Sequence, residues 1–454
     1  MYNKEHIVII GLGETGFACA SFFARQKFPV VVLDSRESPP KLLDLKTHYP
    51  NVPVFTGGFL VSELSKATTI ILSPGIPKDH PDLVKGILPH AEIIGDIELF
   101  AREAKAPVVA ITGSNGKSTV TSLVGEMARV AGLRVAVGGN LGTPIISFLE
   151  TNPELYVIEL SSFQLETTYS LKPLVSTILN ICPDHMDRYP TLEDYENAKM
   201  RIFKNCQSIV FNRDEKRWGG LPPFTSDGSL CPSGIPKLSF GLESPDEFGY
   251  GLIYQNNEYW LSKGSELLLP QKQLKLLGHH NIANALAALA LGERVGLPKE
   301  AMLTTLRTFR GLSHRCEWVR NRQQVVWIND SKGTNVGATL AALKGLQSEI
   351  PGKWVLIAGG EGKNADFSPL KAIIPKMCRA VILIGKATLE LEAVLGKDIM
   401  CKRANSMEEA VLAASHLAEA GDGVLLSPAC ASFDMFRNFE ARGDAFKIAV
   451  QGLL

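Results

Sequence analysis

The stretch VVAITGSNGKSTVTSL, residues 108–123, decides the fold. It joins an apolar run at Val108–Thr112 to a glycine-rich turn and then to a helical pattern closed by Gly132. Where a strand turns into a helix, successive backbone N–H groups and the helix N-terminus can hold a phosphate. Lys117 would then reach the β- and γ-phosphates, and Ser118 would bind Mg²⁺. The stretch therefore predicts an α/β domain that binds a nucleotide.

The loop itself departs from the strict phosphate-loop pattern. That pattern, G-x-x-x-x-G-K-[ST], requires glycine at position 111, where this chain has Ile111. A glycine turn with an unrelated lysine and serine is the alternative, and the strand–turn–helix context favours the phosphate loop. The predicted nucleotide-binding residues are Gly113, Ser114, Asn115, Gly116, Lys117, Ser118 and Thr119.

On both sides of this stretch, short apolar runs alternate with helical patterns, which is typical of mainly parallel sheets flanked by helices. We expect three α/β domains, spanning residues 1–95, 96–311 and 312–454, with a surface loop at the Gly-, Pro- and Ser-rich segment 219–230. Open α/β sheets bind ligands at the carboxyl ends of their strands. The expected strands are Ile7–Ile10, Val30–Asp34, 69–73, Val108–Thr112, 134–137, 155–158, 177–179, 325–328, 354–358, 380–384 and Gly423–Leu426.

A second glycine loop, GLGETG at 11–16, follows the first expected strand, and Asp34 ends the second strand. This arrangement satisfies the dinucleotide-binding fingerprint, which alone would indicate a nicotinamide-dependent dehydrogenase. Physically, the fingerprint requires only a diphosphate on backbone amides and a polar group near a ribose or base. A UDP-sugar meets both requirements, and a tight turn without a ligand is a further alternative.

The amino-acid composition limits the kinds of partner that the chain can bind. Lys+Arg and Asp+Glu number 47 each, so the chain has no net charge with which to hold nucleic acid or an anionic membrane. No apolar stretch approaches the roughly 20 residues of a membrane span, and the apolar run before Gly11 is too short for a signal-peptide core. The eight cysteines contain no CxxC pair, which favours reduced thiols in a cytoplasm.

Several other polar residues follow expected strands. Glu159 ends an apolar strand, where a carboxylate beside a phosphate loop is a natural metal ligand. His185 lies in PDHMD just beyond another strand, and a structural histidine is the alternative. Lys199 lies on an expected helix, where a solvated lysine is the ordinary interpretation, and His314 with Arg315 would be a surface pair.

Two motifs in the last third of the chain also follow strands. The segment NDSKGTN at 329–335 contains Asp330 and Lys332, and its polar residues could serve only as helix caps. The segment GGEGK at 359–363 could be only a flexible turn. From spacing alone, both alternatives stay open.

Taken together and in this order, the motifs resemble the Mur ligase family, and the resemblance covers nearly the whole chain. The family's loop has the form G-[ST]-N-G-K-[ST], which accounts for the missing glycine. Within the family, GLGETG, SPGIP at 73–77 and SPACASFDMFRNFEARGDAF at 427–446 look like the member that adds D-glutamate to UDP-N-acetylmuramoyl-L-alanine. The other matching segments are GGNLG at 138–142, IELSSFQLE at 158–166, DHMDRYP at 184–190, HNIANALAA at 280–288, SHRCE at 313–317, NDSKGTN at 329–335 and GGEGKNADFSPL at 359–370.

The resemblance implies Rossmann-like N- and C-terminal domains around a P-loop ATPase-like central domain. It also implies four sets of site residues, and it implies nothing for 213–275, which matches poorly. The UDP-substrate set is Gly13, Glu14, Thr15, Ser35, Arg36, Gly75 and Asn140. The ATP set adds Asn281, Asn284, Arg315, Asp330 and Lys332 to the phosphate loop. The metal set is Ser118, Glu159, His185 and Lys199, the last as a carbamate, and the D-glutamate set is Thr334, Lys363, Ser432 and Phe439. The catalytic residues implied are Lys117, Asn140, His185, Lys199 and Arg315.

The activity implied is formation of an amide bond with ATP and Mg²⁺, through an acyl phosphate, for cell-wall synthesis and hence cell shape and division. We expect a cytoplasmic monomer that binds no nucleic acid. Three alternatives remain: a Mur-type or folylpolyglutamate ligase for another amino acid, a nicotinamide-dependent dehydrogenase, and a nucleotide-switched binding module. The amino acid that triggers phosphate release separates the ligases, and a binding module would release none.

Overall fold

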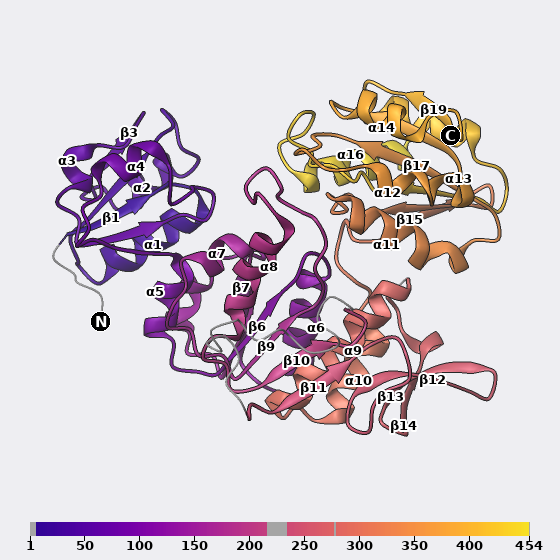
Figure 1. Ribbon diagram of the computed structural model, residues 1–454, viewed down its shortest axis with the longest axis horizontal. Coiled ribbons are helices and arrows are strands. Elements are labelled where there is room, and N and C mark those ends of the chain that lie inside the picture. Colours follow the sequence, from indigo (N-terminus) through magenta and orange to yellow (C-terminus); the bar gives the residue numbers. More distant parts are fainter. Residues whose placement is uncertain (1–5, 216–233, 277, 454) are drawn as a thin grey trace.

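The computed structural model describes residues 6–215, 234–276 and 278–453. The chain forms three sheets, each flanked by its own helices, which confirms the expected three-domain α/β class (Figure 1). Each sheet falls within one of the expected ranges, and the boundaries at 95 and 311 stay a prediction. The segment 219–230, where we expected a surface loop, lies outside the described residues.

The first sheet has the order β3-β2-β1-β4-β5, and all of its strands are parallel. Its central strands β1, β2 and β4 consist mainly of buried branched residues, as expected for strands covered on both faces. Because these three strands are neighbours, their carboxyl ends meet at one edge of the sheet. The elements are β1 (Ile7–Ile10), α1 (Glu14–Arg25), β2 (Val30–Asp34), α2 (Leu42–His48), β3 (Val54–Thr56), α3 (Val61–Leu64), β4 (Thr69–Leu72), α4 (Pro81–Gly86) and β5 (Glu92–Ile94).

Helix α5 (Asp96–Glu103) follows the first sheet and contributes to two cores. Ile97 and Phe100 pack into a core of the central domain, whereas Leu99 packs into the core of the first domain. Its start is fixed as well, because Gly95 donates its N–H to the Thr167 carbonyl at 3.1 Å. The helix therefore joins the first two domains by packing as well as by the chain.

The central sheet has nine strands in the order β14-β13-β12-β11-β10-β9-β6-β8-β7. The strands from β6 to β11 pair in parallel, as expected for this class of sheet, although β10 and β11 themselves were not predicted. The strands β12, β13 and β14 form an antiparallel extension that the sequence did not predict either. The strands are β6 (Val108–Thr112), β7 (Val135–Gly139), β8 (Leu155–Glu159), β9 (Val175–Ile178), β10 (Ile209–Asn212), β11 (Lys237–Phe240), β12 (Tyr250–Gln255), β13 (Glu258–Lys263) and β14 (Glu266–Pro270). The helices are α6 (Lys117–Val130), α7 (Ser162–Glu166), α8 (Leu192–Met200), α9 (His279–Val295) and α10 (Lys299–Thr308).

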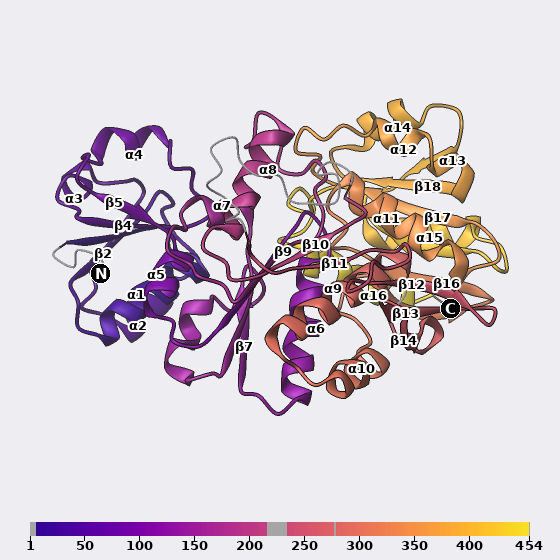
Figure 2. The ribbon, with the colours of Figure 1, turned by 60° about the horizontal axis from the view of Figure 1, so that its bottom comes forward.

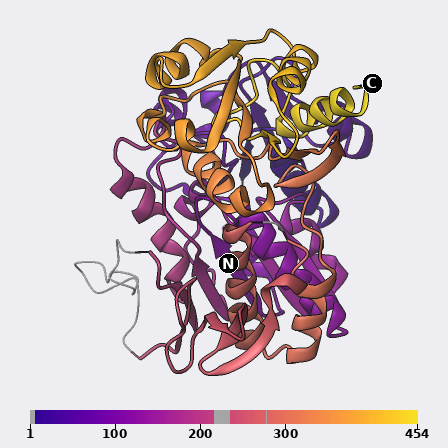
Figure 3. The same cartoon turned by 90° about the vertical axis from the view of Figure 1, so that its right-hand side faces the viewer.

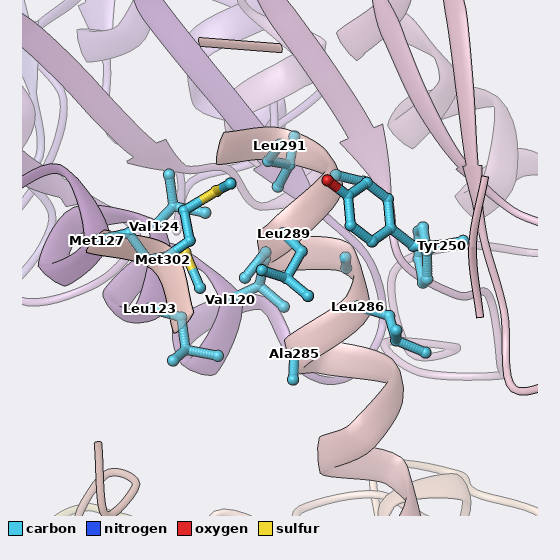
Figure 4. Packing of buried hydrophobic residues seen from close by; sticks show 14 of the residues in the cluster. Val120, Leu123, Val124, Met127, Tyr250, Ala285, Leu286, Leu289, Leu291 and Met302 are labelled. Carbon is cyan, nitrogen blue, oxygen red and sulfur yellow. The ribbon is translucent and has the colours of Figure 1, made fainter. Parts of the chain in front are cut away.

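Helix α6, which starts at the phosphate loop, is anchored by its apolar face. Val120, Leu123, Val124 and Met127 recur at helical spacing, and each is fully buried. They pack with side chains of α9 and α10 in one cluster (Figure 4). Burying a side chain of this size contributes about 1.5–3 kcal/mol. This packing fixes the N-terminus of α6 relative to the sheet.

The third sheet has the order β15-β16-β20-β17-β18-β19, with β15 antiparallel to β16 and the other pairs parallel. Of its strands, β15 and β19 were not predicted. The strands are β15 (Glu317–Arg322), β16 (Val325–Asn329), β17 (Trp354–Gly359), β18 (Cys378–Ile384), β19 (Met400–Arg403) and β20 (Gly423–Leu426). The helices are α11 (Val336–Leu346), α12 (Ser368–Lys371), α13 (Ile374–Met377), α14 (Thr388–Leu395), α15 (Met407–Leu417) and α16 (Phe439–Gln451).

The central domain lies between the other two. Figures 1 and 2 show the first and third domains on opposite sides of it, and Figure 3 shows the third domain above it from a second direction. The third domain touches the central one directly, since Arg315 Nη2 donates to Ser118 Oγ at 2.6 Å. Among the helices of the described residues, none has the length and apolar character to cross a membrane.

Candidate active site

The turn after β6 is shaped to hold an anion. Gly116 precedes α6 with a left-handed backbone (φ +81°), and no described side chain caps the helix there. The N–H groups in the first turn of α6 and the positive end of the helix dipole therefore point at the space in front of the loop. Lys117 folds back over the turn, where Nζ donates to the carbonyls of Gly113 at 2.8 Å and Ser114 at 2.9 Å.

Three further basic side chains lie around this turn. Lys199 is 2% exposed and donates from Nζ to Gly113 O at 3.0 Å, and burial, followed by repulsion from Lys117, holds the pKa of its amine well below the usual value. Burial, followed by repulsion from Arg315, lowers the pKa of Lys332 to about 8. Burial also lowers the pKa of Arg315. The site thus concentrates positive charge where phosphates would lie.

Glu159 is the main negative group among these cations. Its Oε2 accepts from Ser118 Oγ at 2.5 Å, and its Oε1 accepts from Asn140 Nδ2 at 2.7 Å. Burial alone would raise the pKa of Glu159, but the cations Lys117 and Arg315 and these hydrogen bonds hold it below the usual value. The carboxylate and hydroxyl are hard oxygen donors close together at a phosphate loop, so they fit Mg²⁺.

His185 lies beyond β9 with a left-handed backbone, φ +58°. Its ring packs edge-on against Phe163 at 4.9 Å between centroids, and its Nε2 lies 3.9 Å from Asp184 Oδ2. Burial lowers the pKa of His185; Asp184 opposes this effect, and the cations Lys363 and Lys117 add to it. A neutral imidazole has a free nitrogen lone pair, which is what a metal ligand requires.

Two adjoining cavities collect the residues predicted for ATP and D-glutamate. In the first, of about 390 Å³, Asn284 Nδ2 donates to Asn281 Oδ1 at 2.9 Å. The predicted residues that line this first cavity are Asn115, Gly116, Thr119, Asn281, Asn284, Arg315, Asp330 and Lys332. Those lining the second, of about 410 Å³, are Ser114, Asn115, Gly116, Lys117, Asn140, Glu159, His185, Lys199, Arg315, Lys332, Thr334, Lys363, Ser432 and Phe439.

Asp330 sits between Arg315 and the third sheet. Its Oδ2 accepts from Ser427 Oγ at 2.7 Å and its Oδ1 from Cys316 N at 3.2 Å. Burial raises the pKa of Asp330 to about 6, although both hydrogen bonds favour the charged form. Lys332 Nζ lies 4.0 Å from the centroid of the Phe439 ring. The third domain therefore presents an acid and a cation to the phosphate loop.

The residues predicted for the UDP-substrate lie elsewhere, apart from Asn140. Gly13, Glu14 and Thr15 follow β1, Ser35 and Arg36 follow β2, and Gly75 follows β4, so all six lie at the carboxyl edge of the first sheet.

The acidic residue of the fingerprint, Asp34, has an internal role at this edge. Its carboxylate accepts from Leu12 N at 2.7 Å and from both Nε and Nη2 of Arg36, at 2.9 and 2.6 Å. These hydrogen bonds hold the pKa of Asp34 below the usual value, although burial opposes them. Because the protein itself uses this carboxylate, Asp34 is less suited to binding the ribose of a dinucleotide.

Sequence reasoning missed several residues that line the second cavity. Asp184 and Asn335 are linked there by a hydrogen bond of 3.1 Å, and Phe163, Asn438 and Glu440 also line the cavity. Asp184 and Asn335 stand inside the quoted motifs DHMDRYP and NDSKGTN, which was the available signal. Their contact joins residues 151 positions apart, so spacing could not reveal it.

The fold and site define a three-domain α/β protein in which a glycine loop at the N-terminus of α6 shares a cavity with residues of a separate domain. Comparison with known families agrees: the chain matches the "Mur ligase middle domain" over 111–292, the "Mur ligase MurD-like, N-terminal domain" over 5–95 and the "Mur ligase, glutamate ligase domain" over 314–430. The chain belongs to the Mur ligase family.

Within this family, the chain shares about half of its residues with proteins that carry one particular name. The chain is 51% identical over 448 residues to the UDP-N-acetylmuramoylalanine–D-glutamate ligase of Nitrosococcus oceani, covering 98% of this chain and 96% of that protein. It is 50% identical over 446 residues to the ligase of the same name from Pseudomonas aeruginosa, covering 98% of each.

Solved structures share the fold at low identity. The UDP-N-acetylmuramate–alanine ligase of Thermotoga maritima has a TM-score of 0.63 and 19% identity, covering 98% of this chain and 99% of that chain. The MurF ligase of the same organism, solved in complex with ADP, has a TM-score of 0.62 and 15% identity, covering 99% and 96%.

Proposed function

We propose that this chain is an ATP-dependent ligase that joins D-glutamate to UDP-N-acetylmuramoyl-L-alanine and releases ADP and phosphate, in peptidoglycan precursor synthesis. The observation that carries the proposal is the second cavity, where the loop residue Lys117 and the third-domain residues Lys363 and Ser432 line one space. The full-length relatives bear the name of this reaction. We place the enzyme in the cytoplasm and expect a monomer that binds no nucleic acid.

In the first step, an oxygen of the substrate carboxylate attacks the γ-phosphorus of ATP, and the bond to the β-phosphate oxygen breaks. The products are an acyl phosphate and ADP. Both reactants are anionic, so repulsion opposes their approach. Lys117 and Arg315 stabilise the negative charge on the transferring group. Mg²⁺ held by Ser118 and Glu159, with a second ion at His185 and Lys199, would neutralise phosphate charge when bound.

In the second step, the amino nitrogen of D-glutamate attacks the acyl carbon. The tetrahedral intermediate then expels phosphate, and the nitrogen loses a proton as the amide forms. Lys363 and Ser432 suit the two carboxylates of D-glutamate, because a cation and a hydroxyl donate strong hydrogen bonds to such oxygens. An acyl phosphate hydrolyses if water reaches it, so closure of the third domain over the loop protects it.

Lys199 has a separate proposed role as a carbamate. Only a neutral amine attacks CO₂, and burial of Lys199 favours the neutral amine by lowering its pKa. The nitrogen–carbon bond forms as the amine loses a proton, which gives an anion with two oxygen ligands for a hard cation. Crystals of the active enzyme should show a carboxylated Lys199, and acetate should partly restore Lys199→Ala. A bare amine in crystals that turn over substrate would reject this role.

The first glycine loop is proposed to bind the uridine diphosphate of the substrate. The support is its position on a different domain from the ATP site and the internal use of Asp34. Calorimetric titration should show binding of the UDP-sugar and none of NAD(H) or NADP(H). Tight nicotinamide binding at Gly11–Gly16 would overturn the ligase assignment.

The deciding experiment is phosphate release with UDP-N-acetylmuramoyl-L-alanine, ATP and Mg²⁺, with each candidate amino acid added separately. Among the amino acids tested, only D-glutamate should cause rapid release of phosphate. Release with another amino acid would indicate a different Mur-type or folylpolyglutamate ligase. ATP binding with no release for any amino acid would indicate a nucleotide-switched binding module.

A further inference from the structure

Asn335 is the residue before helix α11, and both the oxygen and the nitrogen of its side-chain amide form hydrogen bonds. Its Oδ1 accepts from Ala338 N at 2.8 Å, which caps the helix. Its Nδ2 donates across the domain interface to Asp184 Oδ2 at 3.1 Å and to Asn115 Oδ1 at 3.3 Å. The residue is 6% exposed. One side chain therefore fixes the start of a third-domain helix to two segments of the central domain.

The two central-domain partners, Asn115 and Asp184, belong to two different segments of the site. Asn115 is the third residue of the phosphate loop; its N–H donates to Asn180 Oδ1 at 2.9 Å, and its carbonyl accepts from Asn180 Nδ2 at 3.1 Å. Asp184 immediately precedes His185 in the chain and accepts from Asn335 with one carboxylate oxygen. Asn335 thus meets both the segment that cradles phosphates and the segment that carries His185.

The third-domain side of this contact leads to the amino-acid pocket. Thr334 directly precedes Asn335 and lines the second cavity together with Lys363. Asn335 contacts the phosphate loop, and the residue joined to it by one peptide bond lines the pocket. A shift of the loop relative to Asn335 would therefore also shift the pocket. Arg315, which reaches Ser118 from the same domain, touches the loop at a different point.

We propose that Asn335 is a positioning residue that sets the closed arrangement of the third domain, aligning the D-glutamate pocket with the phosphate loop. The inference rests on the proposed function for its kinetic consequence, but the contact itself is independent of the substrate. Asn335 touches no reacting atom in this role. It acts through Asn115 and Asp184.

The test separates this role from simple helix capping. In Asn335→Ser, the serine can still cap α11 but is too short to donate to Asp184 and Asn115. The matched control is Ser406→Ala, which removes the side-chain acceptor for Glu409 N at the start of α15 in the same domain. The Ser406 variant should lose thermal stability and keep its kinetics, whereas the Asn335 variant should keep its stability and lose turnover.

We expect Asn335→Ser to lower kcat/KM for D-glutamate by about 10- to 100-fold, the scale of hydrogen bonds to a charged group. The affinity for an ATP analogue should change less than about threefold. Hydrogen exchange of the holoenzyme should increase in peptides covering Asn115 and Asp184 with Asn335→Ser, and not with Ser406→Ala.

Wild-type kinetics together with unchanged exchange at Asn115 and Asp184 would overturn the role of Asn335. Equal effects of both variants would overturn it as well, because capping alone would then explain them. If the wild-type enzyme released no phosphate with D-glutamate while exchange increased in Asn335→Ser, the proposed function would fail and the domain contact would stand.

Discussion

The two glycine loops have the same local architecture, strand then turn then helix, but the charges around them differ in sign. At the first loop, a carboxylate of the protein, that of Asp34, accepts from Leu12 N, so an internal anion already faces the turn. At the second loop, Lys117 and Arg315 lie around Glu159 at the N-terminus of α6, and Lys332 adds a third basic group to the same cavity. The first loop is stabilised by hydrogen bonds and packing, and the second carries excess positive charge.

This difference shows that a glycine pattern identifies a backbone shape, and that the surrounding charges determine its ligand. A loop with its own carboxylate and an arginine suits the polar end of a nucleotide-sugar. A loop with several desolvated cations suits the charge that develops when a phosphoryl group is transferred. Substitutions in either loop, or in the cavity in front of the second loop, should therefore show which property each loop depends on.

The largest effect is expected at the second loop. Lys117→Ala should lower kcat by at least about 100-fold, because a preorganised electrostatic group is lost from the transition state. The free energy of unfolding should change little, since the hydrogen bonds of Lys117 within the described residues go to two loop carbonyls. Turnover and thermal unfolding should be measured on the same sample. A folded variant with near-normal turnover would contradict the phosphate-loop assignment.

At the first loop, a substitution should destabilise the fold through a steric clash. A Cβ on Gly16 would lie 1.8 Å from the carbonyl oxygen of Gly11, whereas a Cβ on Gly13 would meet nothing within 4 Å. Gly16→Ala should therefore lower the free energy of unfolding by about 1–3 kcal/mol, as overpacking does. Gly13→Ala is the matched control and should unfold like the wild type. Equal stability of the two variants in denaturant titrations would show that the turn adjusts freely.

A smaller kinetic effect is expected for Lys363, a basic residue on the third-domain side of the second cavity. Lys363→Ala should raise KM for D-glutamate by about 30-fold, the scale of a hydrogen bond to a charged group. KM for ATP should stay near the wild-type value, because Lys363 belongs to the third-domain side of the cavity. Steady-state kinetics with each substrate varied would check this. An equal rise in both constants would place Lys363 at the nucleotide.

The smallest effect concerns pH and Lys332. Its pKa of about 8 means that the amine is charged below that pH and neutral above it. The wild-type kcat/KM for ATP should therefore fall about tenfold between about pH 7 and 9, as the cation is lost from the free enzyme. Lys332→Arg keeps its charge over this range and should flatten the profile. An alkaline fall of the same size in both proteins would assign it to another group.

The buried strands were predictable because they are continuous apolar runs. Ile7–Ile10 and Val108–Thr112 appear in the structure with the expected bounds. The edge strand β15 was missed because its sequence EWVRNR is charged and only partly buried, so no apolar pattern marks it. The antiparallel extension β12–β14 was missed because exposed tyrosines and short turns interrupt its pattern.

The site was predictable to the extent that its residues follow strands. Glu159 and Asp330 each stand at or just after the end of a parallel strand, so the fold brings them to a sheet edge. The contact of Asn335 with Asn115 was not predictable, because it joins residues 220 positions apart on two domains. Such a contact depends on how the domains meet, which no local pattern records.

Helix α5 has a consequence for the size of the substrate. Because Leu99 belongs to the first core and Phe100 to the central core, this helix ties the glycine loop of the first domain to the phosphate loop of the central domain by packing. The third domain follows a segment of turns between α10 and β15, and among the described residues no helix lies within that segment. Under the proposed function, the first two domains would measure the length of the nucleotide-sugar. A nucleotide-sugar with a shorter arm would occupy the first loop and leave its carboxylate out of reach of the γ-phosphate.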